Sequence, residues 1–211
     1  MFRQFLDNRL YFIVNIFYFR ESQLIMEVKR ISPRVNCFLQ VKLDQEIIDY
    51  LWKIIDISKT NNINFKNKLA GNISQSLVLE DIDSFFYKSV CKPLVQYYRK
   101  NNPLGGDPVS QNALLKPNTK LILNQFWVNY QYKTEFNPFH DHSGVYSFAI
   151  WLKIPYDWED QKQLPIFNDM KEGNIKAGNF EFEYSNSLGE SKTIEYRLSP
   201  KCNGLMLFFP A

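Results

Sequence analysis

The sequence has 211 residues, of which 45% are hydrophobic and 16% are aromatic, and its formal net charge is +3. A chain of this length can bury one substantial core without being divided into two domains. Acidic and basic residues are mixed along it, so the concentrated basic face of a nucleic-acid-binding protein is not expected. Cys37, Cys91 and Cys202 are widely spaced and form no CxxC pair, which favours reduced thiols in a cytoplasmic protein.

The first 25 residues differ from the rest, and we interpret residues 1–25 as an N-terminal extension of a single domain that covers residues 26–211. Residues 10–19 are almost entirely apolar. This run is shorter than the roughly 20 residues that a membrane-spanning helix needs, and no small-residue cleavage site follows it. No membrane association is therefore expected. Met26 is an alternative start, because ordinary globular sequence begins at Glu27.

Helical periodicity dominates the first half of the domain. A short strand over residues 35–41 precedes an amphipathic helix over residues 44–58, which has an aspartate at its N-cap. Residues 60–78 are rich in asparagine and serine and predict a loop. A second helix should begin near Leu79, and Pro93 should kink or divide it, because proline donates no backbone hydrogen bond.

The period changes from helical to two in the second half of the chain. Alternating residues predict two long strands, over 121–132 and 144–154. Three further strands are predicted over residues 180–184, 193–198 and 204–209. Helices followed by several antiparallel strands indicate an α+β protein whose second half is a sandwich or jelly roll.

The two faces of the predicted strand over residues 144–154 differ in character. One face is continuously large and apolar, whereas Ser147, Ala149 and Trp151 lie on the other. Small residues beside one large aromatic side chain can line a ligand cavity. They can equally allow close packing of the sheet against a helix, and the alternation leaves both interpretations open.

His140 and His142 are the only histidines in the chain, and Asp141 separates them. On an extended strand the two imidazoles would project from one face and could share a metal ion, whereas Asp141 would point away unless a bulge turned it inward. A non-haem iron(II) site commonly combines two histidines with one carboxylate. The spacing alone does not exclude an ordinary surface pair, and a zinc site would lack a third imidazole or a cysteine pair.

The strongest family signal lies in Trp127-Val-Asn-Tyr130 and in the segment from Asn137 to Pro155, which contains the histidines. These segments resemble the iron(II)- and 2-oxoglutarate-dependent oxygenases, especially the prolyl-hydroxylase-like branch found in marine phages and bacteria. The resemblance covers roughly residues 27–211 and implies a double-stranded β-helix, or jelly-roll, core with N-terminal helices packed on it. Other stretches similar to this branch are residues 69–73, 178–184 and 198–210.

The resemblance assigns roles to individual residues. His140 would be the first iron ligand, and His142 would occupy the second position, where many relatives carry an acid; Asp141 is the alternative second ligand. The co-substrate site would include Tyr130, as the tyrosine that hydrogen-bonds 2-oxoglutarate, and a wall formed by Ser147 and Trp151. The implied cofactors are Fe(II) and 2-oxoglutarate, and the substrate is unknown, a protein side chain being one candidate.

The sequence departs from the family at its end. In relatives, the distal histidine and then a basic residue follow a strand like residues 204–210, whereas no histidine follows His142 and Arg197 precedes that place. The resemblance thus predicts a dioxygenase whose last strands are missing and whose activity is impaired. The alternative is a non-catalytic jelly-roll module with a binding or phage structural role. We expect a cytoplasmic protein, as in a phage-infected bacterial host.

Overall fold

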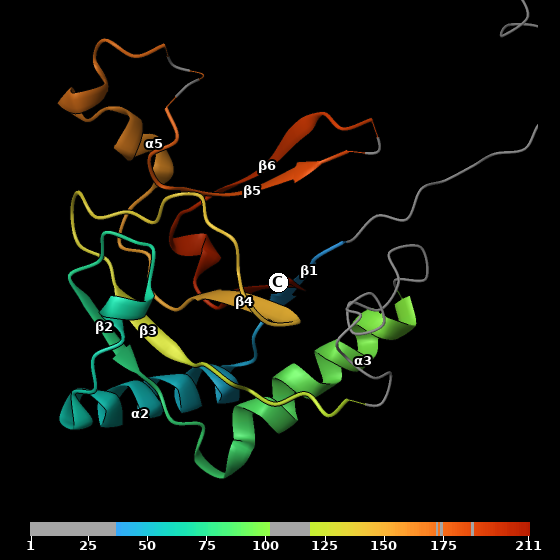
Figure 1. Ribbon diagram of the computed structural model, residues 1–211. Helices are drawn as coiled ribbons and strands as arrows, with labels where there is room; N and C mark the ends of the chain where they lie inside the picture. Colours follow the sequence, from blue (N-terminus) through green and yellow to red (C-terminus); the bar gives the residue numbers. More distant parts are fainter. Residues whose placement is uncertain (1–36, 102–118, 172, 174, 187) are drawn as a thin grey trace, which may run out of the picture. The chain divides into compact units, whose positions relative to one another are not determined.

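The structure is a computed structural model that describes residues 37–101, 119–171, 173, 175–186 and 188–211. The predicted extension over residues 1–25 and the alternative start at Met26 lie outside the described residues. The helices are α2 (Gln45–Asn61), α3 (Lys92–Asn101) and α5 (Trp158–Lys162), and the strands are β1 (Leu39–Lys42), β2 (Gln75–Val78), β3 (Trp127–Tyr130), β4 (Tyr146–Trp151), β5 (Asn179–Ser185), β6 (Ser191–Arg197) and β7 (Leu205–Pro210) (Figure 1). None of the described helices has the length and hydropathy that a bilayer crossing demands.

The strands form three antiparallel sheets. β7 is the centre of a sheet with the order β1-β7-β4, β2 pairs with β3, and β5 pairs with β6. Within the part of the chain that the structure describes, these sheets do not close into a barrel. The protein is thus a mixed α+β protein with several antiparallel sheets and few helices, as the change of period along the sequence predicts.

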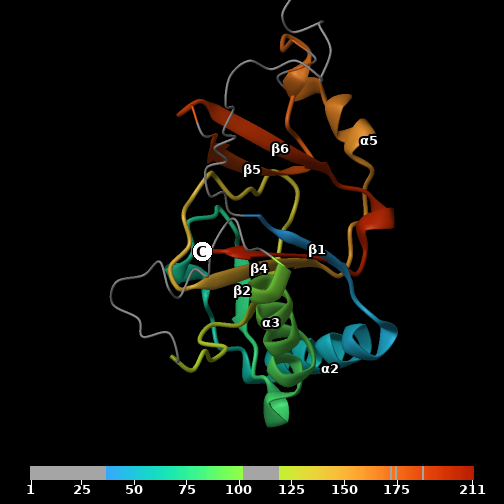
Figure 2. The ribbon, with the colours of Figure 1, turned by 90° about the vertical axis from the view of Figure 1, so that its right-hand side faces the viewer.

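One face of the β1-β7-β4 sheet packs against helices α2 and α3 (Figures 1 and 2). Phe148 of β4 contacts the fully buried Phe86, with 5.5 Å between ring centroids. Tyr146 of β4 meets Tyr98 of α3 at 5.4 Å, and Tyr98 is also fully buried. The continuous apolar face predicted for residues 144–154 therefore forms part of the hydrophobic core.

The opposite face of this sheet carries the β5–β6 hairpin through aromatic contacts. Phe182 of β5 lies 4.9 Å from Phe209 of β7 and 4.5 Å from Phe38, as measured between ring centroids. Phe180 meets the ring of Trp151 edge-on at 5.1 Å. Offset and edge-to-face aromatic pairs at these distances add stability beyond the area that they bury.

The second helical segment begins with a carboxylate cap rather than at Leu79. Asp81 accepts hydrogen bonds from the backbone N–H groups of Phe86 and Tyr87, at 2.8 and 2.9 Å, and from the hydroxyl of Tyr50 at 2.7 Å. Donors in the first turn of a helix have no intrahelical partner, so one side chain satisfies two of them.

A π-helical turn over Tyr87–Cys91 separates the start of this helical segment from α3. Pro93 lies in the first turn of α3 and cannot donate the hydrogen bond that a regular helix would make there. A widened turn that accommodates the missing donor is a typical response. The predicted division at Pro93 is not seen: the helical backbone runs on through Pro93, and the irregularity is the π-helical turn just before it.

Cys91 is buried beside this turn, and its environment makes a chemical prediction. Burial, reinforced by the charge of Asp81, raises the pKa of the Cys91 thiol to about 12. At pH 8 the thiol is therefore protonated, whereas the nucleophile in alkylation is the thiolate. We expect iodoacetamide to modify the exposed Cys37 rapidly and Cys91 only after unfolding. Peptide mass mapping of the alkylated native chain measures both, and equal labelling rates would contradict the burial of Cys91.

Two strands differ in extent from the sequence prediction. The strand predicted over residues 121–132 is limited to β3, and that over 144–154 is limited to β4. β2 lies within residues 60–78, which were predicted as loop. Its Ser76 is fully buried and donates to the side chain of Asn129 in β3 at 2.8 Å, so tertiary pairing overrides a composition typical of loops.

The β5–β6 hairpin places Glu181 directly opposite Glu195, and Lys176 lies between them. The Lys176 ammonium is 2.8 Å from Glu181 and 3.0 Å from Glu195, whose side chains are only 12% and 24% exposed. Like charges on facing positions of paired strands destabilise a sheet unless a counter-ion neutralises them. Lys176 therefore holds together a pair that would otherwise repel.

Replacing Lys176 by methionine should lower the free energy of unfolding by about 1 kcal/mol, because Glu181 would lose its cation and Glu195 would keep only Arg197, which lies 3.1 Å away. Thermal unfolding followed by circular dichroism measures this change. The matched control is Lys192→Met, since Lys192 pairs with Glu190 on the exposed part of the same hairpin. The control should leave the melting temperature unchanged, and an equal loss in both variants would refute the argument.

Candidate metal centre

His140 and His142 lie in an irregular segment between β3 and β4, so the extended-strand geometry that would place both imidazoles on one face does not apply to them. The segment cannot continue a ladder, because Pro138 has no N–H to donate and Gly144 has a φ of 113°. The loop nevertheless brings the two side chains together. Their ring centroids are 4.8 Å apart, with 39° between the ring planes.

This separation fits two imidazoles that bind one metal ion. A divalent metal bonds an imidazole nitrogen at about 2.1 Å, which puts it about 3.2 Å from the ring centre. Two such ligands at a right angle around the metal would have ring centres about 4.6 Å apart. The observed 4.8 Å is close to that value. The separation of the two ring centres is thus compatible with two imidazoles on one metal ion.

The hydrogen bond of His140 prepares one of its nitrogens for a metal. Its Nδ1 lies 2.8 Å from the carbonyl oxygen of Pro138. A carbonyl only accepts, so Nδ1 carries the proton and donates it, and the lone pair is left on Nε2. Metal-binding histidines commonly donate their second nitrogen to a carbonyl in this way. The loop thus selects the tautomer in which Nε2 can bind a metal.

His142 is held in its neutral form. Burial lowers the pKa of the half-buried His142, and the neighbouring His140 lowers it further, while Asp141 opposes both effects. Its ring packs edge-on against Phe209 of β7, with 5.4 Å between ring centroids. A metal needs an unprotonated imidazole. The folded chain therefore presents His142 in the state that binds metal at neutral pH.

Asp141 is not brought into a shared site with the two histidines. It lies exposed on the loop. Among the described residues, no group of three or more histidine, cysteine or acidic side chains is placed to hold a metal ion. The arrangement consists of two imidazoles, and Asp141 has no assigned position in it.

Ser147 and Trp151 lie on one face of β4, the face that points toward the β5–β6 hairpin. Ser147 is directly opposite Phe209, the residue that touches His142, so it lies near the histidine pair. Trp151 is four residues further along the strand, about 13 Å away, and contacts Phe180. Ser147 therefore lies at the end of β4 that is near the histidines, and Trp151 lies at the other end of the same strand.

Tyr130 occupies a different neighbourhood from the histidines. Its hydroxyl is buried and has no hydrogen-bond partner within the described residues, and burial raises its pKa. Its charged neighbours are Lys59 and Asp56 of α2, on the helical side of the structure. His142, by contrast, touches the face of the sheet that points away from the helices. The structure therefore does not bring Tyr130 to the histidine pair.

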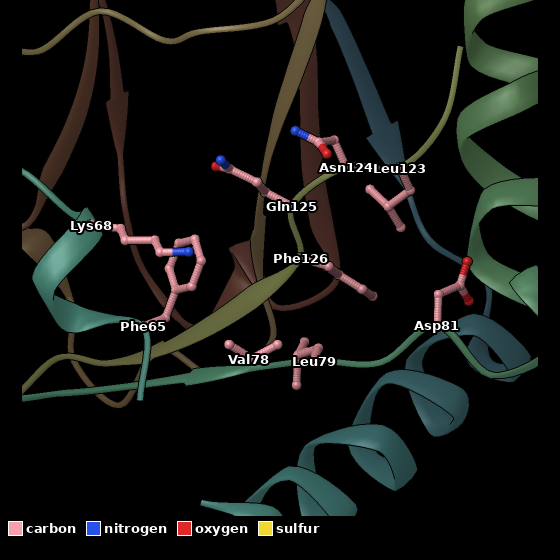
Figure 3. A pocket seen from close by; sticks show the side chains of 9 residues that line it. All are labelled: Phe65, Lys68, Val78, Leu79, Asp81, Leu123, Asn124, Gln125 and Phe126. Atoms are coloured by element: carbon pink, nitrogen blue, oxygen red, sulfur yellow. The ribbon is translucent and has the colours of Figure 1, made fainter. Parts of the chain in front are cut away.

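A separate hollow of about 380 Å³ contains none of the predicted site residues (Figure 3). It lies where β2 ends, beside the short turn over Lys66–Lys68 and the segment before β3. Its charged Asp81 is already engaged as a helix cap. Its lining residues are Phe65, Lys68, Val78, Leu79, Asp81, Leu123, Asn124, Gln125 and Phe126.

Sequence reasoning missed two partners of the histidines. Phe209 could have been suspected, since it lies on a predicted strand and faces the opposite side from Phe208. The carbonyl of Pro138 carried no sequence signal, because any residue supplies one. The arrangement as a whole is a pair of neighbouring imidazoles, one of which packs on the apolar ring of Phe209. In comparisons with known proteins, no family model, no curated protein and no solved structure matches the chain.

Proposed function

We propose that the protein is an iron(II)- and 2-oxoglutarate-dependent dioxygenase that hydroxylates a substrate of unknown identity. The observation that carries this proposal is the pair of imidazoles at 4.8 Å, one of them with its tautomer fixed for metal binding. Two histidines and an oxygen ligand are a common donor set for iron(II). Iron is preferred over zinc because a closed zinc site needs more nitrogen or sulfur ligands than this loop supplies.

The chain's own residues would perform three tasks in this function. His140 and His142 would hold the iron through Nε2 of the first and a neutral ring nitrogen of the second. Phe209 would keep water from one side of the His142 ring. Ser147, which pairs with Phe209 across β4 and β7, would offer a hydroxyl to the co-substrate. When bound, iron(II) with 2-oxoglutarate and oxygen supplies oxidative chemistry in which a C–H bond is hydroxylated and 2-oxoglutarate becomes succinate and carbon dioxide.

The arrangement of sheets supports a jelly-roll core for this dioxygenase. Helices α2 and α3 cover one face of the β1-β7-β4 sheet, and the β5–β6 hairpin lies over the other. A jelly roll places its ligands between two sheets, and His142 touches Phe209 on the hairpin side. The proposed site would then open between the hairpin and the three-stranded sheet.

The function is tested by measuring succinate formation from 2-oxoglutarate with the purified chain, added iron(II) and air. The expected result is slow turnover that depends on iron and is absent from His140→Ala. Ser143→Ala, an exposed neighbour on the same loop, is the matched control and should retain the activity. Succinate formation that is equal in wild type and His140→Ala would overturn the proposal.

A non-catalytic jelly-roll binding or structural module is the second candidate. Two observations favour it: the described residues supply no third metal ligand, and Tyr130 faces α2 instead of the histidines. In this case the histidine pair would bind a metal for stability, or no metal. Metal binding that raises the melting temperature without any turnover of 2-oxoglutarate would favour this candidate.

A further inference from the structure

The hollow beside β2 and β3 begins where the two strands separate. The last hydrogen bond between the two segments runs from the N–H of Leu79 to the carbonyl of Phe126, at 2.9 Å. Beyond this bond the segments run in different directions (Figure 3). The segment that leads into β3 is held again at Leu121, whose carbonyl accepts from the hydroxyl of Tyr87 at 2.6 Å. The segments that line the hollow are therefore fixed by hydrogen bonds at two points.

Part of the lining is apolar and belongs to the packed core. Leu79 and Phe126 are only 7% and 9% exposed. The ring of Phe126 stacks on the fully buried Phe86, with 5.1 Å between ring centroids and 17° between ring planes. Because the core holds this surface in place, an apolar ligand that covers it gains hydrophobic free energy without rearranging the fold.

Lys68 supplies a positive charge to the hollow. Its ammonium lies 5.3 Å from the centroid of the Phe65 ring, which is buried and stacks on Trp127 at 4.9 Å. No carboxylate among the residues that the structure describes pairs with this ammonium. A cation that rests on an aromatic ring and has no such counter-ion is available to the anionic group of a ligand.

The other polar side chains of the hollow differ in what they can still bind. The carboxylate of Asp81 already accepts three hydrogen bonds, and Figure 3 shows it at the side opposite Lys68. Asn124 and Gln125 carry exposed side-chain amides that make no hydrogen bond within the described part of the chain. One anionic group therefore fits beside Lys68, whereas a second one near Asp81 would be repelled.

We propose that this hollow binds a small organic anion with one negative charge, whose carboxylate or sulfonate pairs with Lys68 and whose apolar ring lies on Leu79 and Phe126. The amides of Asn124 and Gln125 donate further hydrogen bonds to the ligand. The volume of about 380 Å³ lies within the range of roughly 300–1,000 Å³ that is typical of small-molecule sites. Neither histidine lines the hollow, so this site goes beyond the proposed dioxygenase function and does not depend on it.

Fluorescence titration of the purified chain with 8-anilinonaphthalene-1-sulfonate, an aromatic anion that fluoresces when it leaves water, tests the proposal. We expect saturable binding that is at least about fivefold weaker in Lys68→Met, because the ion pair is lost. The matched control is Lys66→Met, since Lys66 lies on the same short turn but outside the lining, and its affinity should be that of wild type.

A neutral probe of similar shape, N-phenyl-1-naphthylamine, separates the charge of the ligand from its apolar contacts. Its affinity should be the same for wild type and Lys68→Met. No saturable binding of the sulfonate, or equal sulfonate affinities of wild type and Lys68→Met, would overturn the proposal. An equal loss in Lys66→Met would also overturn it, because the attraction would then be a general effect of surface charge.

The place of binding is tested in two ways. Asn124→Trp changes an exposed residue, should fill the hollow and should abolish binding of the sulfonate, and its thermal unfolding shows whether the variant is folded. NMR titration of the wild-type chain needs no substitution. The amide signals of Leu79 and Gln125 should shift with added sulfonate, and that of Gly144 beside the histidines should not. Shifts confined to residues outside the lining, or undiminished binding by folded Asn124→Trp, would refute the assignment.

Discussion

Replacing His140 by alanine is expected to lower the affinity of the chain for iron(II) about 100-fold, and replacing His142 to do the same. The site has two imidazoles at 4.8 Å, so the loss of either leaves a single nitrogen ligand. Even the loss of an outer hydrogen-bonding partner commonly costs about 10–100-fold in metal affinity, and the loss of a direct ligand costs at least as much. Anaerobic isothermal titration calorimetry with iron(II) measures the effect.

Ser143→Ala and Asp141→Asn are the comparison variants for this experiment. Ser143 is an exposed neighbour of the histidines, so the Ser143→Ala protein should bind iron with the affinity of the wild-type protein. Asp141 is exposed and outside any ligand group among the described residues, so its replacement should change affinity far less than loss of a histidine. If Asp141→Asn abolished binding and His142→Ala did not, the assignment of the second ligand would have to be reversed.

Replacing Asp81 by alanine should lower the free energy of unfolding by about 3 kcal/mol, the largest stability effect that the polar contacts predict. One carboxylate accepts from the backbone of Phe86 and Tyr87 and from the hydroxyl of Tyr50. Truncation leaves three donors without this acceptor in a partly buried region. A loss of this size corresponds to a melting temperature about 6–12 °C lower for a chain of this length.

Denaturant titration followed by circular dichroism measures this loss. Glu80→Ala, the exposed carboxylate that precedes Asp81, is the matched control and should unfold as wild type does. Tyr50→Phe removes one of the three hydrogen bonds and should show an intermediate loss of about 1 kcal/mol. Asp81→Ala with the stability of Glu80→Ala would show that the cap does not hold the helix in place.

The sequence predicts well those features that depend on local chemistry. The alternation of residues 180–184 locates β5, because a strand with two different faces must alternate, and the strand predicted over residues 204–209 is β7. Pro93 marks the irregular helical turn, since its missing N–H has the same consequence in any fold. The proximity of His140 and His142 follows from their spacing, even though they lie on a loop and not on a strand.

The features that sequence reasoning missed depend on tertiary partners. β2 lies in a segment whose asparagine and serine content is typical of loops, and its pairing with β3 makes it a strand. Tyr130 was assigned to the co-substrate site by resemblance, but its side chain turns toward Lys59 of α2. Alternation along a strand shows which residues share a face but not which face meets the ligand. The side of β3 that holds Tyr130 therefore could not be inferred from the sequence.

The central claim is that both imidazoles of this loop bind one iron ion, and X-ray absorption spectroscopy of the chain loaded with one equivalent of iron(II) tests it most directly. The account predicts two imidazole ligands per iron, with the remaining positions filled by oxygen, and one imidazole in His142→Ala. An iron environment without imidazole scattering, or one unchanged by His142→Ala, would contradict the account.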